Sequence, residues 1–93
     1  MKYLDDSIML AMLEKVQPLQ IEILKTGHSA HLDGGPHSQW PDRTASYISF
    51  ELTVFEENEI IKSFEFSAME TEEVLDATYG LAVAYTKYLK AHV

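Results

Sequence analysis

Two segments of alternating apolar and polar residues lie close together in the middle of the chain, at 45–55 and 60–67. An apolar residue at every second position is typical of a β-strand with one buried face. The apolar residues that share this face are Ile48, Phe50, Leu52, Val54, Phe64 and Phe66. Because only the short polar segment EENE connects the two segments, they predict a β-hairpin and therefore an antiparallel sheet.

The opposite face of the predicted hairpin is polar, and we expect it to point away from the core. Its residues are Ser49, Glu51, Thr53, Ser63 and Glu65. Lys62 breaks the alternation because it falls on the apolar face. A β-bulge, or a side chain that runs along apolar surface to reach solvent, would accommodate this lysine.

Apolar residues at helical spacing predict a helix at 5–16, which Asp5 or Asp6 caps and Pro18 ends. The residues on its apolar face are Ile8, Met9, Met12, Leu13 and Val16. After it, Leu19, Ile21 and Ile23 alternate with polar residues, which predicts a first strand over 19–25.

A second helix is predicted at the end of the chain. Ser67 and Glu70 form a capping-box pattern, in which each side chain bonds the other's free backbone N–H. The apolar stripe of this helix is Val74, Thr78, Leu81, Ala82, Tyr85 and Leu89. The order of elements is therefore α-β-β-β-α. It predicts one globular α+β domain over residues 1–93, with a three-stranded antiparallel sheet, two helices packed on one face and a long loop at 27–43.

The predicted loop contains most of the candidate site residues. His28, His31 and His37 supply nitrogen ligands for zinc or a similar metal, so a metal- or ligand-binding protein is one hypothesis. Solvated loop histidines are the simpler interpretation, and we expect no cofactor. Trp40 either covers the open end of the core or anchors a partner at an interface.

Negative charge is concentrated in one part of the chain. Residues 51–76 contain nine acidic residues and one lysine, for a net charge of −8. Such a surface repels phosphates, which disfavours direct DNA or RNA binding and favours a basic protein partner. The residues expected to contact that partner are Trp40, Glu51, Glu56, Glu57, Glu59 and Glu65. We also expect Glu70, Glu72 and Glu73 to converge with them at one end of the domain.

The sequence therefore favours a small acidic protein-binding module, an inhibitor or modulator of a basic or nucleic-acid-binding partner. No group of residues in the sequence resembles assembled catalytic machinery, and we expect no enzyme activity. The chain has no cysteine. The N-terminal apolar segment is short and interrupted by Asp5, Asp6 and Glu14, so we expect a soluble cytoplasmic protein without membrane contact.

A third hypothesis is a homo-oligomeric structural subunit. A run of small residues lines one flank of the last helix: Ala77, Gly80, Ala84 and Ala91. Glycine costs a helix about 1 kcal/mol relative to alanine, which indicates that something approaches closely there. We expect the first helix to pack against this flank. The alternative is the seam of a homodimer, assisted by Tyr79 and Val83 on the exposed side.

The order α-β-β-β-α is similar to that of the double-stranded RNA-binding domain. The segment GGPH at 34–37 resembles the Gly-Pro-x-His segment of that family, with spacing one residue shorter. The resemblance implies the same topology. That family's final helix opens with lysines that bind phosphates, whereas this chain has Glu70, Glu72 and Glu73 there. The charge is inverted, so RNA binding is not expected.

Overall fold

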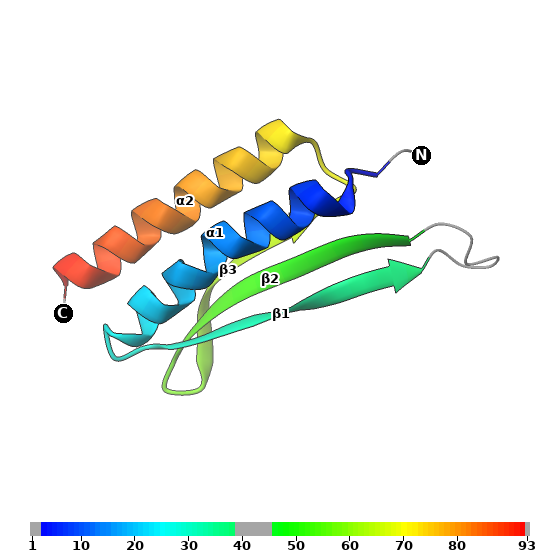
Figure 1. The fold of residues 1–93 in the computed structure, drawn as a ribbon. Helices are drawn as coiled ribbons and strands as arrows, with labels where there is room; N and C mark the ends of the chain where they lie inside the picture. Colours follow the sequence, from blue (N-terminus) through cyan, green and yellow to red (C-terminus); the bar gives the residue numbers. More distant parts are fainter. Residues whose placement is uncertain (1–2, 39–45, 93) are drawn as a thin grey trace.

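In the computed structural model, which describes residues 3–38 and 46–92, the elements follow the order α-β-β-β-α. They are α1 (Asp6–Leu24), β1 (Ser29–Ser38), β2 (Ser46–Glu56), β3 (Glu59–Ser67) and α2 (Glu72–Ala91). The strands form one antiparallel sheet in the order β1-β2-β3, and both helices lie on the same face of it (Figure 1). The predicted fold class is confirmed.

The β2–β3 hairpin has the predicted faces. Phe50, Leu52, Val54, Phe64 and Phe66 are buried between the sheet and the helices. Phe50 lies opposite Phe66 in the register, and their rings stack with centroids 4.9 Å apart. At the tip, Glu57 and Asn58 both adopt positive φ, at 50° and 70°. A two-residue hairpin turn of type I′ requires this conformation at both positions.

Lys62 is accommodated in both of the expected ways. Val54 pairs with Lys62 but Phe55 pairs with Ile60, so Ile61 is the extra residue of a β-bulge in β3. The Lys62 side chain reaches solvent, and its ammonium group lies 5.7 Å from the ring centroid of Phe64 and 5.9 Å from that of Tyr85. The stem of the lysine thus covers apolar surface while the charge remains hydrated.

The first helix is longer than predicted, because Pro18 lies inside it rather than at its end. The predicted strand at 19–25 is therefore wrong. A proline within a helix costs roughly 3 kcal/mol, and burial after it offsets that cost. Ile23 is fully buried and Leu19 packs against the core. Both follow the buried residues Met12 and Val16 at helical spacing.

The first strand lies instead at 29–38, inside the segment predicted as the loop 27–43. Only Ala30 and Leu32 show the alternation, because Gly34 and Pro36, which follow them at every second position, are atypical of strands. Gly34 lies opposite Phe50, and a Cβ at Gly34 would overlap the backbone of Ser49 and Phe50. Pro36 is tolerated because β1 is an edge strand. Gln20 of α1 donates a 3.0 Å hydrogen bond to the Ala30 carbonyl and ties the helix to this strand.

The second helix begins later than predicted. Thr71 is its N-cap, and the Thr71 hydroxyl accepts a 3.2 Å hydrogen bond from the Val74 amide. Ser67 instead ends β3, and its Oγ accepts from the Met69 amide. Four residues of α2 are buried: Leu75, Ala82, Thr86 and Leu89. Of the predicted stripe, Ala82 and Leu89 are confirmed, whereas Val74 and Leu81 are exposed.

The small residues of α2 do not face α1, contrary to expectation. Ala77, Gly80, Ala84 and Ala91 are all exposed, while Tyr79 and Val83 are half-buried. Contact with α1 is made on the other side of the helix. There Lys90 forms a 2.7 Å ion pair with Glu22. The positive charges of Lys90 and Lys25 hold the pKa of the Glu22 carboxyl below its usual value.

Gly34→Ala is expected to destabilise the protein, because the new methyl group meets backbone rather than a movable side chain. Overpacking of this kind costs about 1–3 kcal/mol, or roughly 4–20 °C in Tm for a domain of this size. Urea and thermal denaturation measure the change. Asp33→Ala, on the exposed face of the same strand, is the matched control and should lose no stability. Equal stability of Gly34→Ala and the unsubstituted protein would contradict the close packing of β1 on β2.

Candidate acidic face of the sheet

The face of the sheet that carries no helix has a row of three carboxylates across its three strands. Asp33 of β1 lies opposite Glu51 of β2, and Glu51 lies opposite Glu65 of β3. We call these three residues the carboxylate row. Directly opposite residues in an antiparallel pair have Cβ atoms about 4.5–5.5 Å apart. The row lines a shallow hollow whose wall includes Ser49.

Nothing in the sheet register neutralises the carboxylate row. Like charges directly opposite one another destabilise a sheet, and the pairing partners of Glu51 on both sides are acidic. Thr53 Oγ1 donates a 3.0 Å hydrogen bond to Glu51 Oε1, which orients one carboxylate without adding positive charge. Within residues 3–38 and 46–92, Asp33 and Glu65 form no ion pair. From the repulsion of like charges we expect the row to disfavour the isolated fold and to attract cations.

The hairpin tip extends the acidic surface at one end of the sheet. Glu56, Glu57 and Glu59 are exposed, and Glu56 pairs with Glu59 in the register. Glu56 Oε1 lies 3.9 Å from Nε2 of His28. Burial raises the pKa of Tyr85, in the C-terminal half of α2, and the charges of Tyr88 and Glu56 raise it further.

The acids that begin α2 do not join this surface. The chain turns from β3 into α2 at the end of the sheet opposite the hairpin tip (Figure 1). The predicted convergence of Glu70, Glu72 and Glu73 with the tip is therefore wrong. The physical reason is that β3 runs the whole length of the sheet between the two groups, and nine residues of strand span about 30 Å.

The three histidines of the metal hypothesis are not brought together. His28 Nδ1 lies 2.8 Å from Thr26 Oγ1, and the ring of His31 packs edge-on against Phe55. His37 lies in β1 six residues beyond His31, which is about 20 Å along a strand. Among the side chains that the structure describes, no group of three or more histidines, aspartates or glutamates has the geometry of a metal site.

Sequence reasoning placed Glu51 and Glu65 on the polar face of the sheet but did not place Asp33 there. The alternation of Ala30 and Leu32 with His31 and Asp33 was the signal that would have found it. Trp40, the other residue expected at the partner surface, lies outside the described residues.

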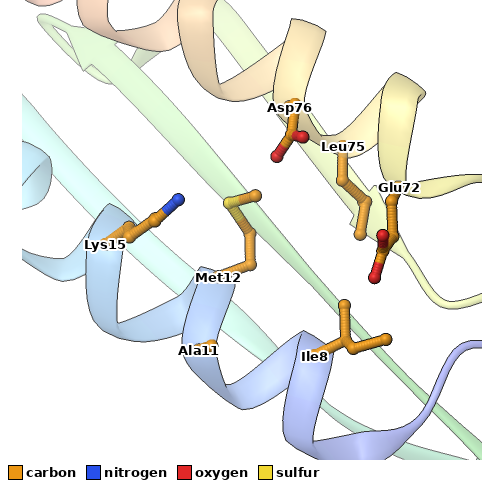
Figure 2. Close-up of a pocket in the computed structure, with 7 residues that line it drawn as sticks. All are labelled: Ile8, Ala11, Met12, Lys15, Glu72, Leu75 and Asp76. Atoms are coloured by element: carbon orange, nitrogen blue, oxygen red, sulfur yellow. The ribbon is translucent and has the colours of Figure 1, made fainter.

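A groove of about 280 Å³ separates the N-terminal halves of the two helices (Figure 2). Met12 and Leu75 lie on its apolar side, and Lys15 faces the helix that carries Asp76 and Glu72. The Lys15 ammonium group lies 5.5 Å from the ring centroid of Tyr79, so the lysine packs on α2 instead of projecting outward. The residues that line this groove form part of the contact between the helices.

In comparisons with known proteins, no protein-family model, no curated protein and no solved structure matches the chain. The resemblance to the double-stranded RNA-binding domain is thus limited to the order of elements. The first turn of α2 carries Glu72 and Glu73 where that family has lysines. Within the described residues, neither helix is long and apolar enough to cross a membrane.

Glu51→Gln is expected to stabilise the domain by about 0.5 kcal/mol, because it removes the like charge from both cross-strand pairs and keeps an acceptor for Thr53. Urea denaturation at low ionic strength measures the gain. The gain should shrink in 1 M salt, where the screening length falls to about 3 Å. Glu14→Gln removes an equal charge from an exposed position of α1 and serves as the control. A loss of stability in Glu51→Gln alone would show that the row is not repulsive.

Proposed function

We propose that this protein is a small acidic binding module that binds a basic protein partner through the helix-free face of its sheet and its hairpin tip. The observation that carries the proposal is the carboxylate row, in which Asp33, Glu51 and Glu65 are direct neighbours across three strands. The row destabilises the unbound domain, and lysine or arginine side chains of a partner reverse that effect.

The arrangement of the acids supports a partner that spans both parts of the surface. The sheet holds the carboxylate row at fixed spacing, so its charges need no ordering when a ligand binds. The hairpin tip adds Glu56, Glu57 and Glu59 on a turn. A single-signed surface of this kind accelerates association with a basic protein, and salt weakens the effect.

The net negative charge of the chain favours a basic protein as the partner over a nucleic acid. Nucleic-acid binding depends on lysine and arginine contacts to phosphates, whereas the chain carries a net charge of −8. An acidic domain competes with nucleic acid for the same basic surfaces. The function proposed here is therefore that of an inhibitor or modulator of a basic or nucleic-acid-binding protein.

A titration of the ¹⁵N-labelled protein with an oligolysine peptide tests the surface. Changes in amide chemical shift should be largest at the carboxylate row and the hairpin tip and smaller elsewhere. The triple variant Asp33→Asn/Glu51→Gln/Glu65→Gln should bind about tenfold more weakly, a loss of ~1.4 kcal/mol. The matched control Glu70→Gln/Glu72→Gln/Glu73→Gln has the same net charge, with its changes at the far end of the domain, and should bind within about twofold of the unsubstituted protein.

Capture from a lysate of the source cells then tests the biological partner. The unsubstituted protein and the control variant should retain the same basic protein in stoichiometric amount. The row variant should lose it, and so should Glu56→Lys/Glu57→Lys/Glu59→Lys. Equal peptide binding by the two triple variants, or the absence of a stoichiometric basic partner, would contradict the proposal.

A further inference from the structure

Helix α2 has a second apolar face that nothing in the described chain covers. Val74, Leu81 and Tyr88 are 43%, 64% and 55% exposed and recur at intervals of seven residues. Glu72 lines the groove beside α1 and Lys90 pairs with Glu22 of α1. Leu81 is nine residues from each of them, which is two and a half helical turns. The second apolar face therefore points away from α1.

Small residues complete this face in the pattern of a helix-pairing seam. Ala77, Ala84 and Ala91 follow the three large residues at an interval of three, and all are exposed. An apolar residue at alternating intervals of three and four is the spacing by which two helices pack along their length. A Cβ at Gly80 would meet no atom within 4 Å, so nothing inside the monomer requires a glycine there. A closely approaching second helix does require small residues.

The charges beside this seam identify the second helix. Glu73 and Lys87 lie seven residues on either side of Gly80, on one border of the exposed face. In an antiparallel pair of α2 helices, Glu73 of each copy lies beside Lys87 of the other, so the two-fold axis creates two opposite-charge contacts. A parallel pair would instead place this border beside the opposite border of the seam, where Thr78 and Tyr85 offer no opposite charge. The border is complementary to itself only in the antiparallel arrangement.

Tyr88 is already ordered for such a contact. Its ring stacks with Tyr85 at a centroid distance of 6.1 Å and lies 4.2 Å from the ring of His92. An exposed aromatic side chain held between two rings loses little conformational entropy when a partner covers it.

We propose that a second copy of this chain packs antiparallel on α2, through Val74, Leu81 and Tyr88 with the alanines between them. The seam belongs to the helix layer and leaves the carboxylate row on the far side of the sheet uncovered. The dimer and the binding of a basic partner are therefore separate properties.

Sedimentation equilibrium on the untagged protein tests the dimer. We expect a monomer–dimer equilibrium with a dissociation constant on the order of micromolar, since one helix pair buries an area at the low end of stable interfaces. Leu81→Glu should weaken association at least tenfold with unchanged circular dichroism. Ile21→Glu changes an exposed apolar residue of α1, which is 55% exposed, and should leave association unchanged.

A charge exchange tests the direction of the pair. Glu73→Lys and Lys87→Glu should each weaken the dimer, because each places like charges at both symmetric contacts, and the double variant should restore it. A strict monomer at about 500 µM would overturn the proposal, since interfaces of this size associate well below that concentration. A dimer that survives Leu81→Glu, or a double variant that fails to restore association, would overturn it equally.

Discussion

The packing of Phe50 between Gly34 and Phe66 is the contact on which the rest of the sheet depends. Phe50 lies against the bare backbone of Gly34 on one side and stacks on Phe66 on the other, so one residue connects all three strands. A slip of one residue in either pairing would turn the apolar set of the shifted strand toward solvent. A slip of β1 that set Asp33 opposite Phe50 would also bring a side chain into the space at Gly34. The register is therefore fixed by sterics and burial together.

That same register aligns the carboxylates. Asp33, Glu51 and Glu65 are the chain neighbours of Gly34, Phe50 and Phe66, and adjacent residues of a strand point to opposite faces. Once the three inward residues are in line, the three acids are in line on the other face. Core packing thus imposes an arrangement that electrostatics disfavours, and the sheet holds it without needing a bound ligand.

The hairpin and the presence of both helices were predictable because their signals are local. Alternation over 48–54, a short polar connection and helical spacing at 8–16 each depend on near neighbours. The break in the alternation at Lys62 predicted a β-bulge, and the bulge is present at Ile61. What failed was the segment from Leu19 to Ser38. Leu19, Ile21 and Ile23 satisfy both a strand period and a helix period, and only burial of Ile23 against the core decides between them.

The same ambiguity hid part of the candidate site. Gly34 and Pro36 are typical of loops, and they are compatible with β1 only because Phe50 needs the space and because β1 is an edge strand. Neither condition is visible before the strands are paired. Asp33 was consequently assigned to a loop, while Glu51 and Glu65 were placed correctly on the polar face. On α2 the stripe was misassigned because two apolar faces share one helix, and the sequence does not say which of them meets the core.

Two unrelated surfaces on one small domain have a combined consequence. The carboxylate row lies on the sheet and the second apolar face of α2 lies in the opposite layer, so occupation of one leaves the other accessible (Figure 1). An antiparallel pair through α2 presents two carboxylate rows related by a two-fold axis. A partner with two basic sites, or a surface with repeated ones, then binds the pair more tightly than the single domain, because the second contact forms at a high effective concentration. Helix pairing as proposed would thereby amplify the proposed electrostatic contact without changing any residue that makes it.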